Sequence, residues 1–297
     1  MNHIKDQIRC GAAYRLGLTG KGIGVAVLDT GIFLHRDFDS RVTGFADMVN
    51  GKNFAYDDCG HGTHICGIIG GSGRMSGGRY SGIAPGCDLV MVKVLDRKGN
   101  GYSSDVLAGI SWILERKEKL GIRILNISVG ACSKRGMSEN SALVKGVNRA
   151  WDAGLVVVVA AGNNGPRTMS ITTPGISRKV ITVGCSDDDR EGLVGGNRMV
   201  DYSGRGPTAA CICKPDLVAP GCSVVSCSSR ADKYTIKSGT SMSTPIVSGA
   251  VALLLERFPD MTNKDVKLRL RESSVDIGLP RNQQGWGLLD VGKMIGK

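Results

Sequence analysis

Four polar side chains in this sequence are of types that could act together in nucleophilic chemistry. Asp29 ends an apolar run, and Asn163 follows another. His61 could accept and return a proton near neutral pH, because imidazole is the side chain that titrates closest to neutrality. Ser241 comes directly before an apolar helical segment, whose N-terminal N–H groups could stabilise a developing oxyanion. The Asn163 amide could donate a hydrogen bond into the same region.

Each of these residues also has a purely structural interpretation. Asp29 precedes Thr-Gly and could simply form a turn, and Asn163 could occupy a left-handed turn position. Ser241 could be only a helix N-cap. Either His61 or His64 could be a packed or metal-binding histidine, although the glutamate of an HExxH motif is absent and no third ligand follows nearby. No single segment decides between the two interpretations.

The elements that must position these residues alternate between strand and helix. Continuous apolar runs predict strands that are covered on both faces; they are Gly24 to Leu28, Leu89 to Leu95, Ile122 to Val129, Leu155 to Ala161 and Val180 to Val183. Three- and four-residue apolar spacing predicts helices at His61 to Ile69, Ser104 to Lys119, Ser141 to Asp152, Thr244 to Arg257 and Asn263 to Glu272. The pattern is typical of an α/β fold with a mainly parallel sheet, whose chemistry gathers beyond the carboxyl ends of the strands.

Together, the four residues occur in motifs that resemble those of the subtilisin-like serine peptidases, and in character most those of intracellular bacterial members. The chain order Asp29, His61, Ser241 is that of the family. The matching motifs are Ala26-Val27-Leu28-Asp29-Thr30-Gly31, His61-Gly62-Thr63-His64, Ala161-Gly162-Asn163 and Gly239-Thr240-Ser241-Met242-Ser243-Thr244-Pro245. The resemblance extends from about Gly11 to Gly287 and implies a three-layer α/β/α fold with a mainly parallel central sheet.

The resemblance also implies a mechanism. Ser241 would be the nucleophile of a serine endopeptidase that acts through an acyl-enzyme, and His61 would be its general base. Asp29 would orient His61. Asn163 and the Ser241 N–H would bind the oxyanion of the tetrahedral intermediate.

Protein or peptide substrates would bind in extended conformation, by pairing with exposed backbone edges. The family positions map onto twelve substrate-binding residues: Gly99, Asn100, Gly101, Ser128, Val129, Gly130, Ala160, Ala161, Gly162, Thr173, Pro174 and Gly175. Because none of these residues is charged, we expect apolar side chains to be favoured at P1, the substrate residue on the acyl side of the scissile bond.

Composition limits the other function classes. The chain has 297 residues, 41% hydrophobic and 22% charged, and we expect one catalytic domain over residues 1–297 with no recognisable signal peptide or long pro-region. The net charge of +11 comes from scattered Lys and Arg without a basic-aromatic block, so we expect no nucleic-acid partner. No apolar stretch is long enough to span a membrane. Ten irregularly spaced cysteines favour free thiols and a cytoplasmic location.

We expect no cofactor for the chemistry and assign no residue as a metal ligand. Asp37, Asp57 and Asp58 could bind a hard cation, but the segment Ser72 to Tyr80 is poor in oxygen ligands and contains two arginines. A structural calcium ion is therefore the disfavoured alternative. A proteinaceous inhibitor is an expected type of regulator.

Two other function classes are compatible with the motifs. A binding scaffold could keep the peptide groove without cleavage, although all four catalytic positions carry the expected residue types. An esterase or peptide ligase could use the same acyl-enzyme.

Overall fold

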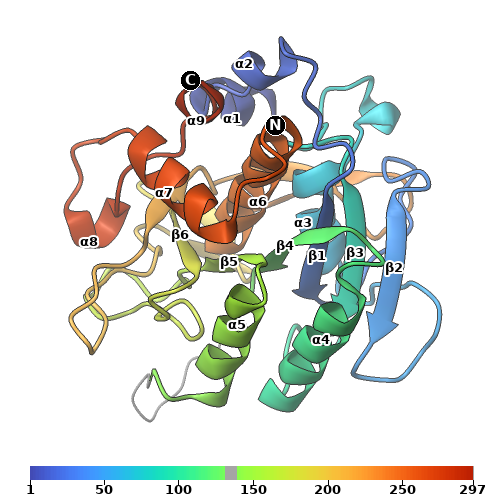
Figure 1. The fold of residues 1–297 in the computed structure, drawn as a ribbon, viewed down its shortest axis with the longest axis horizontal. Helices are drawn as coiled ribbons and strands as arrows, with labels where there is room; N and C mark the ends of the chain where they lie inside the picture. Colours follow the sequence, from blue (N-terminus) through green and yellow to red (C-terminus); the bar gives the residue numbers. More distant parts are fainter. Residues whose placement is uncertain (131–138, 297) are drawn as a thin grey trace.

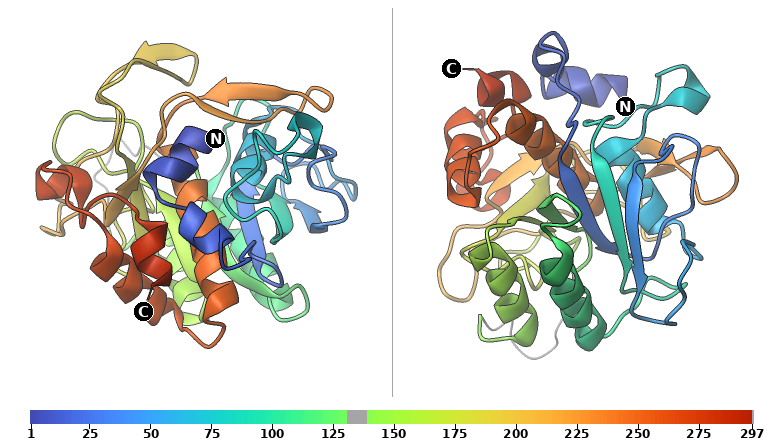
Figure 2. Two further views of the ribbon diagram at one scale, coloured as in Figure 1. Left: turned by 90° about the horizontal axis from the view of Figure 1, so that it is seen from above. Right: turned by 45° about the vertical axis from the view of Figure 1, so that its right-hand side comes forward.

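Seven strands form one parallel sheet in the part of the chain that the structure, a computed structural model, describes: residues 1–130 and 139–296 (Figures 1 and 2). The spatial order is β2-β3-β1-β4-β5-β6-β9, and every neighbouring pair is parallel. The strands are β1 (Gly24–Asp29), β2 (Val42–Asp47), β3 (Asp88–Lys93), β4 (Ile122–Ile127), β5 (Val156–Ala160), β6 (Ile181–Cys185) and β9 (Leu217–Ala219). The predicted α/β fold is confirmed.

Helices cover both faces of this sheet, which gives the three predicted layers. On one face, α3 (His61–Gly70) and α6 (Thr240–Arg257) pack against each other and against the strands. On the other face, α4 (Ser103–Arg116) packs beside α5 (Ala142–Asp152) (Figure 1). The remaining helices are α1 (Asn2–Gln7), α2 (Gly11–Tyr14), the 3-10 turn η1 (Arg74–Ser76), α7 (Asn263–Ser273), α8 (Arg281–Gln284) and α9 (Val291–Ile295).

The core lies between these layers. All residues of β1, β5 and β6 are buried, as expected for central strands covered on both faces. The largest apolar cluster extends along the chain from Met1 to Ile295. No helix among the described residues has the length and apolar character needed to cross a bilayer.

Two antiparallel hairpins lie outside the parallel sheet and were not predicted. One pairs β7 (Gly192–Val194) with β8 (Asn197–Met199), and the other pairs β10 (Val224–Cys227) with β11 (Tyr234–Lys237). Strands of three or four residues leave too short a pattern for periodicity to detect.

The predicted start of the last long helix was wrong. The sequence placed it near Thr244, with Ser241 ahead of it, but α6 begins at Thr240 and contains Ser241 in its first turn. Pro245 favours a helix start because proline is common in the first turn. Here, the Thr240 N–H donates to the side chain of Asn163, a partner 77 residues away that no local pattern reveals.

Candidate active site

Asp29 and His61 form the best-defined contact of the site. Asp29 is the last residue of β1 and fully buried, and His61 is the first residue of α3. The His61 Nδ1 lies 2.7 Å from Asp29 Oδ1 and 2.9 Å from Oδ2. Because a carboxylate only accepts hydrogen bonds, Nδ1 is the donor, and in the neutral ring Nε2 is then unprotonated. His61 is therefore oriented as a proton acceptor.

A short network holds the N-terminus of α3 against the end of β1. The Gly62 N–H donates to the Thr30 hydroxyl, which in turn donates to Asp57. The Asp57 carboxylate also accepts from the N–H and the hydroxyl of Thr63. Asp57 thus satisfies an N–H group of the first turn of α3, and it positions the helix that carries His61. Sequence analysis did not identify this role.

Ser241 lies at the start of α6, two residues after a glycine whose backbone conformation other residues rarely adopt. Gly239 has a φ of +137°, and a Cβ there would lie 3.2 Å from Asn163 Nδ2. The Ser241 hydroxyl donates to the Ser128 carbonyl, with an Oγ···O distance of 2.7 Å. Among the hydrogen bonds of the described residues, none joins this hydroxyl to His61.

Asn163 is fixed by the first residue of α6. Its Oδ1 accepts from the N–H and the hydroxyl of Thr240, at 3.0 Å each. The oxygen end of the amide is therefore occupied, which leaves Nδ2 as the donor end. Asn163 and Ser241 line the same cleft.

This cleft has a volume of about 700 Å³ and also contains His61. Of the twelve predicted substrate-binding residues, six line it: Gly99, Ser128, Val129, Gly130, Ala160 and Gly162. The other six, Asn100, Gly101, Ala161, Thr173, Pro174 and Gly175, lie outside its lining. In place of the segment Thr173 to Gly175, the preceding residue Thr172 lines the cleft, and its N–H pairs with the carbonyl of buried Ala161.

Both hairpins contribute residues to the cleft that sequence analysis missed. The first contributes Leu193 to Gly196 and the second Thr235 to Lys237. Gly195 and Gly196 both have positive φ, as a type I′ hairpin turn requires. That glycine pair was the available signal for the first hairpin.

The second histidine of the motif is a packed core residue. His64 is fully buried, and its Nε2 lies 3.1 Å from the Val224 carbonyl and 3.2 Å from the Thr235 carbonyl. Burial is the main cause that lowers the pKa of His64 from 6.5 to about 3. His64 is therefore neutral at working pH and joins α3 to the second hairpin.

The two cysteines that flank His61 in the sequence differ in exposure. Cys66 is buried, whereas Cys59 is half-buried and lines the cleft. Burial raises the pKa of both thiols, so neither is activated as a nucleophile.

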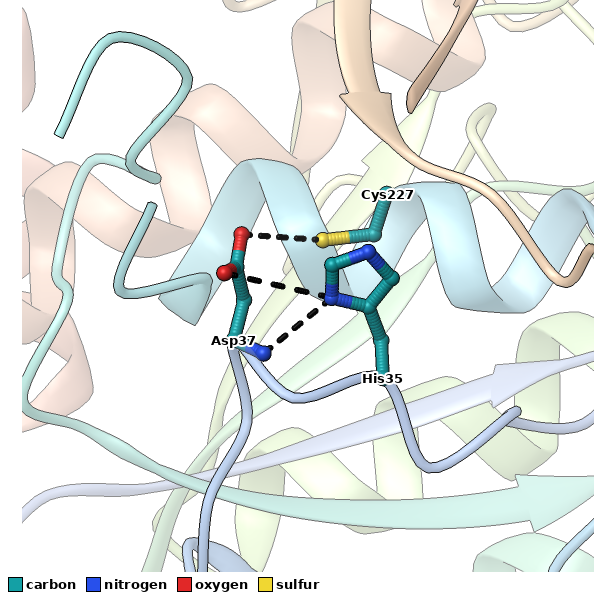
Figure 3. Close-up of side chains that lie close together, drawn as sticks. All are labelled: His35, Asp37 and Cys227. Carbon is teal, nitrogen blue, oxygen red and sulfur yellow. Dashed lines mark hydrogen bonds and ion pairs between the residues drawn. The ribbon is translucent and has the colours of Figure 1, made fainter. Parts of the chain in front are cut away.

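The three carboxylates considered for a cation have protein partners. Asp57 is engaged as described above, and Asp58 accepts from the buried Lys93 ammonium at 2.7 Å. Asp37 lies with His35 and Cys227 in a buried cluster whose ligand atoms are within 4.8 Å of one another (Figure 3).

That cluster already forms a hydrogen-bond network. Asp37 accepts from the Tyr234 hydroxyl and the Met75 N–H, and the Cys227 thiol donates to it. The His35 Nδ1 accepts from the Asp37 N–H, and Nε2 lies 3.1 Å from the Lys233 carbonyl. These contacts satisfy its polar atoms with protein partners.

Comparison with known proteins agrees with the fold. The model of the Subtilase family matches residues 20–287. Serine protease AprX of Bacillus subtilis (strain 168) is 42% identical over 290 residues, which cover 92% of this chain and 65% of that protein. The chain thus spans about two thirds of the length of this relative.

Other relatives match over most of their length. Subtilisin Savinase of Lederbergia lenta is 34% identical over 96% of this chain and 95% of its own. The solved structure of Sphericase superposes with a TM-score of 0.77 at 31% identity, covering 92% of this chain and 93% of that one. The chain belongs to the subtilase family of serine proteases, enzymes of the hydrolase class.

Proposed function

We propose that this chain is an endopeptidase in which Ser241, His61 and Asp29 act as the catalytic triad. The observation that carries the proposal is the bond between His61 Nδ1 and buried Asp29 in a cleft that also contains Ser241 and Asn163. In the proposed reaction, Ser241 Oγ attacks the scissile carbonyl carbon, and its proton passes to His61 Nε2. The C–N bond then breaks, and His61 gives the proton to the leaving amine. Water then attacks the acyl carbon while His61 Nε2 takes its proton, and the C–Oγ bond breaks as His61 returns the proton to Ser241 Oγ.

The hydroxyl must turn before this attack. At rest it donates to the Ser128 carbonyl, so rotation about the Cα–Cβ bond would direct it toward His61. Such a rotation is fast on the catalytic timescale, and apo catalytic hydrogen bonds often form only once substrate is bound.

The proposed oxyanion hole consists of the Asn163 Nδ2 group and the Ser241 N–H. The contacts from Thr240 to Asn163 Oδ1 support the assignment, because they hold the amide in the orientation that keeps its donor end available. The positive end of α6 lies at the same place and would stabilise the negative charge further.

A comparison of serine variants tests the hydrolase proposal. With a chromogenic apolar peptide, Ser241→Ala is expected to lower kcat about 10⁶-fold, the magnitude known for subtilisin. Ser104→Ala is the matched control, since Ser104 is exposed on α4 and lies outside the cleft. Equal near-zero turnover in the unaltered protein and Ser241→Ala would favour the binding scaffold instead. Ester substrates and a search for ligated products distinguish the esterase and ligase alternatives.

We also propose that the cleft accepts apolar P1 side chains. The uncharged lining residues Gly130, Ala160, Gly162 and Thr172 support this preference. In a peptide series that varies only at P1, Phe or Leu is expected to give a higher kcat/KM than Asp or Arg. The opposite order would contradict the proposal.

The remaining features of the proposed function concern its surroundings. We propose that the chemistry needs no cofactor and that a reducing, cytoplasmic environment suits the chain, since its nine described cysteines are free thiols. Cys132 lies outside the described residues. Alkylation followed by mass spectrometry tests the state of the thiols, and native disulfides would contradict the proposal of a reducing environment. A protein inhibitor that presents an extended segment to the cleft is the proposed regulator.

A further inference from the structure

Among the described residues, the Lys, Arg, Asp and Glu side chains that line the cleft are two lysines. Lys98 lies in the loop between β3 and α4, and Lys237 is the last residue of β11. No Asp or Glu occurs among the described residues that line the cleft. Any charged substrate side chain would therefore meet cationic groups there.

Neither lysine is neutralised by an ion pair within the described residues. The carboxylate nearest to Lys98 along the chain is Asp96, which accepts from the N–H groups of Lys98 and Asn100. These hydrogen bonds, with smaller contributions from the charges of Lys93 and Lys98, lower the pKa of Asp96, but Asp96 is outside the cleft lining. Asp58 is held by Lys93. Both ammonium groups thus remain available to a ligand.

The backbone adds to the positive potential. The N-terminus of α6 lies at the cleft, because Ser241 is in its first turn. It carries about half a positive elementary charge, whereas the N-terminus of α3 is already capped by the Asp57 carboxylate. Lys237 acts in the same region, since after burial its charge is the next cause that lowers the pKa of His64 in α3.

We propose that the cleft selects acidic peptides, with carboxylates on the residues that flank the scissile bond and an apolar residue at P1. This inference rests on the proposed function and names its substrate class. Lysine ammonium groups that are not paired within the protein attract substrate carboxylates and repel substrate lysines. The contribution falls with salt, because these groups are near the surface and the Debye length is about 8 Å at physiological ionic strength.

Three peptides of one sequence test this selection, with the same apolar P1 residue and Glu, Gln or Lys at the flanking positions. At low salt, kcat/KM for the Glu peptide is expected to exceed that for the Lys peptide by about three- to tenfold, as expected for exposed charge pairs. In the double variant Lys98→Gln/Lys237→Gln, the ratio is expected to approach one. High salt should reduce the ratio in the unaltered protein.

The matched control is the double variant Arg97→Gln/Lys233→Gln. It removes the same charge from the same two segments, but at exposed residues outside the cleft lining, and should keep the original ratio. A Glu-to-Lys ratio of kcat/KM near one in the unaltered protein would overturn this inference but not the proposed function. A drop in that ratio in the control as large as in Lys98→Gln/Lys237→Gln would do the same. Failure of the Gln peptide to be hydrolysed in a Ser241-dependent way would overturn the proposed function, and this inference with it.

Discussion

At the scale of single residues, the site depends on which end of each polar group is already occupied. The Asp29 carboxylate accepts a hydrogen bond from His61 Nδ1, and the Asn163 side-chain oxygen accepts one from the Thr240 N–H. The motifs predicted that these residues would meet in one cleft. They could not predict the rest position of the Ser241 hydroxyl on Ser128, because side-chain rotamers depend on neighbours distant in sequence.

Asn163 allows the two ends of its amide to be tested separately. Asn163→Asp keeps an oxygen that can accept from Thr240 but removes the Nδ2 donor, whereas Asn163→Ala removes both. We expect both variants to lower kcat by about 10² to 10³, with little change in KM, because the lost bond acts only on the transition state. Steady-state kinetics with an apolar peptide measure this. Near-normal kcat in Asn163→Asp would contradict the oxyanion role.

At the scale of elements, the close approach of α3 to the end of β1 sets the geometry. A Cβ on Gly62 would lie 2.2 Å from the carbonyl oxygen of Gly31, two residues after Asp29. Because this oxygen belongs to the backbone, it cannot move aside without displacing the segment that follows Asp29.

Gly62→Ala is therefore expected to lower the free energy of unfolding by about 1 to 3 kcal/mol, the usual range for overpacking, and to lower kcat. Urea unfolding and peptide turnover measure the two effects. Gly11→Ala in α2 is the control, because its Cβ would only touch Arg15 at 3.5 Å and should leave both quantities nearly unchanged. Equal unfolding free energies in the two variants would contradict the steric argument.

His64 couples α3 to the second hairpin in a pH-dependent manner. Its pKa is about 3 when folded, against 6.5 normally, so between these values the unfolded chain binds a proton that the folded protein does not. Stability is therefore lost as pH falls below about 6.5, at up to about 1.4 kcal/mol per pH unit.

His64→Gln keeps an N–H donor for the Val224 and Thr235 carbonyls but cannot titrate. The unfolding free energy of this variant, measured in urea from pH 7 to pH 4, is expected to fall less steeply than that of the unaltered protein. Parallel curves would show that His64 contributes nothing to acid sensitivity.

The elements also show how far patterns in the sequence suffice. β1, β4, β5, α3 and α5 were predicted within one or two residues, because long apolar runs and helical spacing record burial directly. The strands β2 and β9, the two hairpins and the first turn of α6 were not predicted. Their positions depend on pairing with distant segments, such as the contact between Thr240 and Asn163.

At the scale of the whole molecule, the question of a stabilising cation can be tested directly. The carboxylates of Asp37, Asp57 and Asp58 accept hydrogen bonds from protein donors. A ligand that binds only the folded state raises the unfolding temperature. If the folded protein holds no stabilising cation, EDTA is expected to shift the midpoint of thermal unfolding by less than about 2 °C. Calorimetry of metal-stripped protein with and without added Ca²⁺ measures this. A large rise with Ca²⁺ would contradict the expectation that a structural calcium ion is the disfavoured alternative.

The burial of α3 and α6 has a consequence for the persistence of the enzyme. Almost every residue of both helices is buried, including those adjacent to His61 and Ser241. Amide hydrogen exchange in such segments requires opening of the entire fold rather than local fraying. Helices α3 and α6 therefore open only when the whole chain unfolds and becomes accessible to proteolysis. The resistance of the protein to self-digestion then depends on its global unfolding.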